Sequence, residues 1–189
     1  MTSTDRRYFD EMYASSHDPW NFEASAYERR KYSLTVASLP REKYRNAFEP
    51  GCSIGVLTEL LAPRCERLLA TDINDVALEQ ATKRLERFHG VVVEHRAIPE
   101  SWPVEEFDLV VLSELAYYFD IKTLQILVNQ IVQSTSPAAH VLSVHWRGET
   151  NYPLTGDRVH ALIDGCQRLH HLVHHREEMF VLDLWERRS

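Results

Sequence analysis

Glu-Pro-Gly-Cys-Ser-Ile-Gly, at residues 49–55, is the turn from which the expected fold follows. It holds two of the six glycines of the chain, and glycine is favoured where a ligand approaches the backbone or where φ is positive. Residues 45–49 have the apolar pattern of a short strand, and residues 54–62 have the pattern of a helix. A glycine turn between a strand and a helix is where open α/β sheets bind nucleotides. The turn therefore predicts a nucleotide-binding α/β fold.

An acidic residue follows this turn at a distance that suits a nucleoside. Asp72 lies 21 residues beyond Gly51, at the end of a second expected strand over residues 67–72. A carboxylate at that position accepts hydrogen bonds from the two ribose hydroxyls of an adenosine ligand. The alternative is an ordinary strand–turn–helix junction in which Ser53 caps the helix.

The spacing of the glycines argues against a dinucleotide. Dinucleotide folds use Gly-x-Gly-x-x-Gly to cradle a pyrophosphate, whereas this chain has Gly51-x-x-x-Gly55 with Ser53 between the glycines. A carboxylate at Glu49 would repel a pyrophosphate by about 1 kcal/mol even in a high dielectric. The same carboxylate suits the ammonium and sulfonium groups of S-adenosylmethionine (SAM). We therefore expect SAM as the cofactor and S-adenosylhomocysteine (SAH) as its product.

Strand and helix patterns alternate along the rest of the chain. Such alternation is typical of βαβ units, in which helices cover both faces of a mostly parallel sheet. We therefore predict a Rossmann-like α/β fold that ends in a hairpin of two late strands. The expected strands lie at 45–49, 67–72, 91–97, 107–113, 140–145, 169–174 and 179–185, and the expected helices lie at 26–39, 54–62, 76–88, 122–134 and 156–166.

Length and composition restrict the class of protein. The chain has 189 residues and a formal net charge of −7, which suits one domain and disfavours binding to nucleic acid. We divide the domain into an N-terminal lid, residues 1–40, and a core, residues 41–189. Its three cysteines have no Cys-x-x-Cys spacing, and we find no signal peptide and no apolar run of about 20 residues. We expect a cytoplasmic protein that acts on a small molecule, without a metal or a membrane partner; the oligomeric state stays open.

Six motifs spread over the chain share the pattern of one enzyme family. They are Asp-Pro-Trp (18–20), Tyr-Glu-Arg-Arg-Lys (27–31), Glu-Pro-Gly-Cys-Ser-Ile-Gly-Val-Leu-Thr (49–58), Ser-Glu-Leu-Ala-Tyr-Tyr (113–118), His-Trp-Arg-Gly (145–148) and Tyr-Pro-Leu-Thr-Gly-Asp-Arg-Val-His (152–160). Together they resemble bacterial nodulation-protein-S-like methyltransferases, which are class I, SAM-dependent enzymes. The resemblance implies a seven-stranded sheet with an antiparallel last strand, and an N-terminal helical lid over the cofactor. The namesake methylates the free amine of a deacetylated chito-oligosaccharide, but the acceptor of this chain stays open.

The expected cofactor contacts follow from the turn and from this resemblance. Ala97 and Ile98 stand where many class I enzymes place an acidic contact to adenine, so backbone and an apolar face would hold the base there, with Ile73 on its other side. In the lid, Arg30 would grip the methionine carboxylate and Tyr27 would add a hydrogen bond; a solvated amphipathic helix is the alternative. The full expected set is Trp20, Tyr27, Arg30, Glu49, Gly51, Cys52, Ser53, Asp72, Ile73, Ala97, Ile98 and Ser113.

Candidates for catalysis and for acceptor binding lie after the fourth and fifth expected strands. Glu114 ends the fourth strand and could bind a cationic acceptor or the ammonium group of the cofactor. His145 ends the fifth strand and has the pKa range of a base, which an acceptor needs only if it arrives protonated. We expect these two as catalytic residues, with core packing of the tyrosines and backbone-bonded histidines as the alternative. The expected acceptor-binding set is Tyr117, Tyr118, Arg147, Tyr152 and His160.

The remaining histidines and the competing functions complete the analysis. His170, His171, His174 and His175 are expected on a solvated sheet edge without a metal. The leading hypothesis is a SAM-dependent methyltransferase that acts on an amine or hydroxyl of a small molecule such as a sugar. The alternatives are a SAM-binding protein without catalysis, or a nucleic-acid or protein methyltransferase. Enzymes that methylate bases usually carry an Asn/Asp-Pro-Pro-aromatic turn where this chain has residues 113–118.

Overall fold

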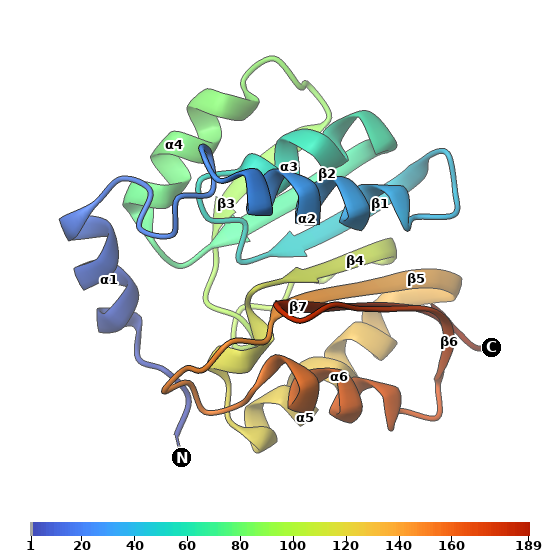
Figure 1. Ribbon diagram of the computed structural model, residues 1–189. Coiled ribbons are helices and arrows are strands. Elements are labelled where there is room, and N and C mark those ends of the chain that lie inside the picture. Colours follow the sequence, from blue (N-terminus) through green and yellow to red (C-terminus); the bar gives the residue numbers. More distant parts are fainter. Residues whose placement is uncertain (1) are drawn as a thin grey trace.

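One sheet of seven strands forms the centre of the protein, whose structure is a computed structural model that describes residues 2–189 (Figure 1). Its strands are β1 (Tyr44–Pro50), β2 (Cys65–Asp72), β3 (Val91–His95), β4 (Phe107–Ser113), β5 (Thr135–Trp146), β6 (Leu169–Arg176) and β7 (Phe180–Arg187). Across the sheet their order is β3-β2-β1-β4-β5-β7-β6. Neighbours run parallel except at β7, which is antiparallel to both β5 and β6. The expected Rossmann-like sheet with an antiparallel last strand is confirmed.

Helices cover both faces of this sheet. They are α1 (Arg6–Ser15), α2 (Ala26–Ala37), α3 (Val56–Leu61), α4 (Asp75–Leu85), α5 (Ile121–Ser134) and α6 (Gly156–Asp164), together with the short 3₁₀ turns η1 (Ala62–Arg64) and η2 (Ala116–Tyr118). In Figure 1, α2, α3 and α4 lie on one side of the sheet and α5 and α6 lie on the other, whereas α1 stands apart at its edge. The strand order reverses between β1 and β4, and ligands bind at such a switch point in open α/β sheets.

Alternate residues of the central strands fill two separate cores. Side chains of one set pack against α2 and α3, and those of the other set pack against α5 and α6. Successive strand residues point to opposite faces of the sheet, so each of β1, β4, β5 and β7 contributes buried side chains to both cores. The first set includes Ala47, Leu109, Leu142 and Leu184, and the second includes Phe48, Val110, Val141 and Trp185.

Polar side chains start the helices that follow the strands. The side chain of Asn74 accepts a hydrogen bond from Ala77 N at the start of α4, and Asp120 accepts from two backbone N–H groups at the start of α5. An N-cap of this kind stabilises a helix by about 1 kcal/mol. The caps fix where the chain leaves each strand, and so they fix the loops at the carboxyl edge of the sheet.

Two boundaries differ from the expectation for identifiable reasons. The helix after the glycine turn begins at Val56, because Gly55 has a φ of +80° and lies outside the helix. Strand β5 begins at Thr135 rather than at residue 140, and its pairing with β4 shifts register between Phe107 and Leu109. Pro and a left-handed Ala138 (φ 63°) lie in this irregular part of the strand, which hides its start from the sequence pattern.

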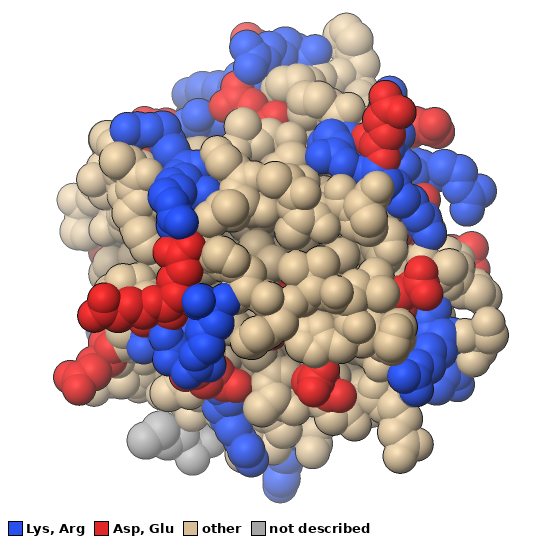
Figure 2. All heavy atoms as spheres, turned by 45° about the vertical axis from the view of Figure 1, so that its right-hand side comes forward, with Lys and Arg blue, Asp and Glu red and all other residues tan. Residues whose placement is uncertain are grey.

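The surface carries interspersed charges. On the face in Figure 2, Lys and Arg side chains lie in small groups, many beside Asp or Glu, around a middle region without charges. This face therefore shows no continuous basic stripe over the described residues. Within residues 2–189, no helix has the length and apolar character that crossing a membrane would require.

Candidate functional site

The glycine turn crosses the carboxyl end of β2 with three residues in left-handed conformations. These are Gly51 (φ 74°), Ser53 (φ 53°) and Gly55 (φ 80°). The N–H groups of Gly51 and Cys52 both donate to the carbonyl of Thr71, at 2.7 and 2.9 Å. A Cβ on Gly51 would lie 3.1 Å from Leu115 Cδ1, so a side chain there would be both strained and crowded. The backbone of the turn is thus held against the sheet.

Asp72, at the end of β2, fixes the same turn. Its Oδ2 accepts a hydrogen bond from Ser53 N at 2.9 Å, and its Oδ1 accepts one from Asn74 N at 3.0 Å. Burial raises the pKa of Asp72, and these backbone N–H groups oppose that rise. Each carboxylate oxygen has a second lone pair that can take a ligand hydroxyl.

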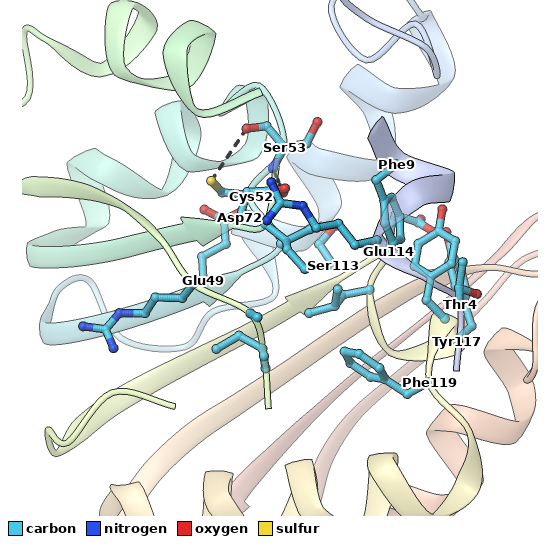
Figure 3. Close-up of a pocket in the computed structure, with 18 of the residues that line it drawn as sticks. Thr4, Phe9, Glu49, Cys52, Ser53, Asp72, Ser113, Glu114, Tyr117 and Phe119 are labelled. Atoms are coloured by element: carbon cyan, nitrogen blue, oxygen red, sulfur yellow. Dashed lines mark hydrogen bonds between the residues drawn. The ribbon is translucent and has the colours of Figure 1, made fainter. Parts of the chain in front are cut away.

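A cavity of about 300 Å³ opens beside the turn and Asp72 (Figure 3). Its walls come from the carboxyl ends of β1, β2 and β4, from residues 96–100, and from the N-terminal segment. In Figure 3, Glu49, Cys52, Ser53 and Asp72 gather on one side, and Phe9, Tyr117 and Phe119 lie on the other. Its volume is at the lower end of the range for small-molecule sites.

Glu49 is the most unusual side chain in this cavity. It is 2% exposed, and its Oε2 makes no hydrogen bond of good geometry among residues 2–189; the neighbouring donor is the hydroxyl of Thr58. Burial raises the pKa of Glu49 from 4.5 to about 8. Buried acceptors nearly always have a partner, so an unpaired carboxylate oxygen in a cavity wall indicates a ligand that donates a proton or carries a positive charge.

Helix α1 covers the cavity, and its side chains form hydrogen bonds with the glycine turn and with the N-cap residue of α4. Phe9 and Tyr13 line the cavity, and Tyr13 OH lies 2.5 Å from Ser53 Oγ. Asp10 Oδ1 accepts a hydrogen bond from Asn74 Nδ2 at 2.9 Å. No motif in the sequence singles out these α1 residues, although Phe9 and Tyr13 have the i, i+4 spacing of one helix face.

Glu114 lies in the cavity wall with both carboxylate oxygens engaged. Its Oε1 accepts from Lys31 Nζ at 2.6 Å, and Lys31 is 1% exposed. Its Oε2 accepts from Tyr117 OH at 2.6 Å and from Trp146 N at 2.9 Å. The residue itself has a φ of 52°. Glu114 therefore positions Tyr117, and its expected role in catalysis stays a prediction.

The two tyrosines after Glu114 form an aromatic wall. Tyr117 and Tyr118 both line the cavity. Behind them, Tyr152 stacks on Tyr117 with ring centroids 5.0 Å apart, and its OH lies 3.4 Å from Tyr118 OH. Tyr152 does not itself line the cavity, so its expected acceptor contact is corrected to a supporting one.

The structure does not place His145 in the cavity wall, where the sequence analysis expects a base for the acceptor. The ring is fully buried, Nε2 accepts from Ala116 N at 3.0 Å, and Nδ1 lies 3.1 Å from both Ser143 Oγ and His160 Nε2. Burial lowers the pKa of His145 well below its ordinary value. His160 is also buried away from the cavity, with Nδ1 2.5 Å from Asp183 Oδ2. Both histidines therefore form hydrogen bonds in the interior of the protein and do not face the cavity.

Three more expected contacts are also corrected. Arg30 makes two hydrogen bonds of 2.7 Å to Glu177, and Tyr27 OH donates to the carbonyl of Met179. Arg147 makes its ion pair with Asp157 at 2.9 Å. None of Tyr27, Arg30 and Arg147 lines the cavity, because long-range partners, which sequence spacing does not show, hold these groups elsewhere.

Most of the expected cofactor residues do meet at the cavity. The wall contains Trp20, Glu49, Gly51, Cys52, Ser53, Asp72, Ile73, Ala97, Ile98, Ser113, Glu114, Tyr117 and Tyr118 from the sequence-based sets. The sequence analysis missed other wall residues, among them Arg6, Phe9, Tyr13, Phe22, Tyr32, Arg96 and Leu115. The motifs at residues 49–55 and 113–118 supply most of the expected residues that line the cavity, whereas the motifs at 27–31, 145–148 and 152–160 supply none.

Comparison of the sequence with known proteins finds similarity to one family. A sequence model of the family described as Nodulation protein S (NodS) matches residues 6–149. Nodulation protein S of Bradyrhizobium diazoefficiens is 30% identical over 139 residues, which make up 72% of this chain and 66% of that protein. Nodulation protein S of Rhizobium tropici is 28% identical over 130 residues, or 68% of this chain and 55% of that protein. The aligned segment thus spans between about half and two thirds of these curated relatives.

Two solved structures have the same fold. A protein of Pseudomonas syringae presented as a candidate methyltransferase has 42% sequence identity and a TM-score of 0.78, and the match covers 86% of this chain and all of that chain. The N-methyltransferase NodS of Bradyrhizobium japonicum, solved in complex with SAH, has 22% identity and a TM-score of 0.87, with 97% and 98% of the two chains covered.

Proposed function

Because the chain belongs to the nodulation protein S family, we propose that it transfers the methyl group of SAM to an amine of a small molecule. The observation that carries the proposal is the cavity beside the glycine turn and Asp72, with the unpaired buried oxygen of Glu49 in its wall. A cationic cofactor would give that oxygen a partner. A pyrophosphate there would meet a carboxylate instead.

The residues around the cavity fit the three parts of SAM. Asp72 would accept the ribose hydroxyls, and Ile73, Ala97 and Ile98 would pack around the adenine. Glu49 would take the positively charged methionine end, and burial strengthens such an attraction. Residues 1–40 would form the lid of a single domain, because α1, which belongs to this N-terminal segment, covers the cavity.

The protein itself contributes to the reaction by aligning the reacting groups and by excluding water from them. When bound, SAM supplies a methyl group on a positively charged sulfur, and displacement at that carbon needs chiefly alignment. Glu114 holds the Tyr117 hydroxyl at 2.6 Å, which fixes the aromatic wall beside the reacting groups. An aromatic face stabilises a nearby cation. A neutral amine needs no base for the transfer itself.

The acceptor is proposed to be an amine on a hydroxylated small molecule such as an aminosugar. Phe9, Tyr117 and Tyr118 offer apolar faces, and Thr4 offers a hydroxyl, in the same part of the wall. This combination suits a ring that has both apolar faces and polar edges. A cytoplasmic location completes the proposal, because the three cysteines are free thiols and two of them are buried.

Ligand binding and product analysis test the proposal in two steps. SAH is expected to raise the midpoint of thermal unfolding and NAD is not, because only a ligand that binds the folded state stabilises it. Incubation with SAM and a panel of aminosugars should then yield products that are heavier by one CH₂ group in mass spectrometry. Equal stabilisation by both ligands would contradict the cofactor assignment. Stabilisation by SAH with no product on any amine would favour a SAM-binding protein without catalysis.

A further inference from the structure

A second cluster of titratable side chains lies away from the cavity, on the sheet face that α6 covers. Asp183 of β7 is 3% exposed. Its Oδ1 lies 2.8 Å from His171 Nε2 and 2.6 Å from His174 Nδ1, both on the edge strand β6. One ligand atom from each of these residues lies within 4.8 Å of the others. We call His171, His174 and Asp183 the β6–β7 triad.

An irregularity in β6 creates this triad. In a regular strand, residues three apart point to opposite faces of the sheet. Here the pairing with β7 shifts register between His171 and Val173, so that His171 lies opposite Trp185 and His174 lies opposite Asp183. Asp183 and Trp185 share one face of β7, and the shift therefore brings both imidazoles to that face. Bulges of this kind commonly re-aim side chains beside functional sites.

Neighbouring carboxyl and imidazole groups orient the triad through hydrogen bonds. In metal sites, the residues around the ligands orient the ligands in the same way. His171 Nδ1 lies 3.0 Å from Asp164 Oδ1, so a carboxylate fixes the ring while Nε2 faces Asp183. On its other side, Asp183 Oδ2 lies 2.5 Å from His160 Nδ1. Metal-binding histidines commonly give their second nitrogen to a carboxylate in this way, and ligating carboxylates are themselves hydrogen-bonded.

The donor set and its exposure suit one class of ion. Two imidazoles and one carboxylate are ligands for Zn²⁺, which takes three protein ligands and a water in tetrahedral open sites. Such ligands lie about 2.0–2.2 Å from the ion. The side chains of His171 and His174 are 34% and 53% exposed, whereas that of Asp183 is 4% exposed. Small ring movements on the solvent side can therefore admit an ion over a fixed carboxylate.

We propose that His171, His174 and Asp183 bind one Zn²⁺ ion at the edge of the sheet. The ion takes the place of the hydrogen bonds that the two rings make with Asp183, and a water completes its coordination. This proposal differs from the expectation of a solvated edge without a metal, which assumed a regular strand. The site is independent of the proposed methyl transfer, because the triad does not line the cavity.

The site also reaches the cavity wall through buried groups. Asp183 contacts His160, His160 Nε2 lies 3.1 Å from His145 Nδ1, and His145 Nε2 accepts from Ala116 N in η2. The next residues of η2 are Tyr117 and Tyr118. Asp183 therefore belongs to the buried hydrogen-bonded network behind the aromatic wall, whereas His171 and His174 lie outside that network.

Calorimetric titration of the full chain with zinc chloride tests the proposal, after treatment with EDTA and dialysis. We expect one Zn²⁺ per chain and no binding of Mg²⁺, which prefers oxygen ligands. His174→Asn removes an exposed ligand and should weaken Zn²⁺ binding at least tenfold. His170→Asn is the matched control, because His170 lies on the same strand outside the triad and contacts Arg188. Asp164→Asn should weaken binding by about tenfold through the ring of His171.

Circular dichroism and thermal unfolding show whether each variant is folded. Zn²⁺ should also raise the unfolding midpoint of the native chain and of His170→Asn, and should leave that of folded His174→Asn unchanged. The proposal is overturned if the native chain binds no Zn²⁺, or if His170→Asn weakens binding as much as His174→Asn does. Neither result depends on whether SAM binds, so the two proposals stand or fall separately.

Discussion

Glu49 combines burial with an unpaired oxygen, and this combination has consequences for the stability of the protein without ligand. Its pKa of about 8 lies above the ordinary value of 4.5. Between these two pH values the folded state holds a proton that the unfolded state releases. The free energy of unfolding therefore falls as pH rises through this window. Below it, both states are protonated and the penalty is absent.

Glu49→Gln should remove this pH dependence. The amide keeps the size of the side chain but does not ionise, so the ligand-free variant should lose less stability between about pH 5 and pH 8 than the native chain. Urea unfolding at a series of pH values measures the difference. The same variant should bind SAH more weakly at pH 8, because a neutral amide attracts the ammonium group less than a carboxylate does. Parallel stability curves for the two proteins would show that Glu49 is already ionised when folded.

Asp72→Ala should weaken SAH binding by about 1–3 kcal/mol, the usual cost of leaving hydrogen-bonding partners unpaired. The change also removes the acceptor of Ser53 N, which holds the glycine turn. Titration calorimetry with SAH gives the dissociation constant. Asp75→Ala is the control, because Asp75 is a neighbouring carboxylate with a mostly exposed side chain. A dissociation constant that does not change in Asp72→Ala would leave Asp72 with a structural role only.

His145→Asn should act on folding and not on the chemical step. The ring accepts a hydrogen bond from Ala116 N inside the protein, and loss of a buried acceptor costs about 1–3 kcal/mol. Chemical unfolding should show that loss. Measured at a temperature where the variant is folded, the pH profile of kcat should keep the native shape. A profile that loses one limb would restore His145 as a base.

The individual residues show where sequence reasoning reaches its limit. Glu49, Gly51 and Asp72 could be assigned because the strand, the turn and the next strand are local features, and all three line the cavity. Arg30 and His145 could not, because their partners, Glu177 and Ala116, are distant in sequence. A charged side chain that looks free in the sequence is often held by an ion pair that only the fold creates.

Among the elements, α1 decides how the cavity is closed. The hydroxyl of Tyr13 on this helix lies 2.5 Å from Ser53 Oγ in the glycine turn. Tyr13→Phe removes that bond and should let SAH dissociate about five times faster, which corresponds to about 1 kcal/mol. Stopped-flow displacement of bound SAH measures the rate. Tyr8→Phe is the control in the same helix, since its hydroxyl lies 3.3 Å from Tyr152 and not at the turn. An equal effect of both changes would mean that α1 acts only through its overall stability.

Regular elements were predictable and irregular ones were not. Strand β4 lies at residues 107–113, as expected. Its seven residues are all buried, and the apolar run of residues 109–112 at its centre is typical of a central strand. The start of β5 and the register shift in β6 were missed. A one-residue irregularity changes which face a side chain occupies without changing the composition of the strand. For this reason, the histidines of β6 could be counted from the sequence but their convergence on Asp183 could not.

For the molecule as a whole, the cavity and the edge strand should respond separately to ligands. The cavity lies at β1, β2 and β4, whereas β6 is the last strand of the sheet, beyond β5 and β7. Bound SAH should slow hydrogen exchange in residues 49–55 and in α1, and it should leave β6 unchanged, because protection follows local opening. Zn²⁺ should slow exchange in β6. Mass spectrometry of peptides after exchange measures both, and protection of β6 by SAH alone would show that the sheet responds as one unit.

The contacts of the first residues decide where a purification tag can be fused. Thr4 N donates to the carbonyl of Tyr118 at 2.7 Å, and Ser3 Oγ lies 3.1 Å from Asp120 Oδ2. Both residues also line the cavity. In Figure 1 the opposite terminus lies on the far side of the molecule, beside β6. We expect an affinity tag fused before Ser3 to lie next to the aromatic wall and to hinder access to the cavity, and we expect a cleavable tag after Ser189 to leave the cavity open.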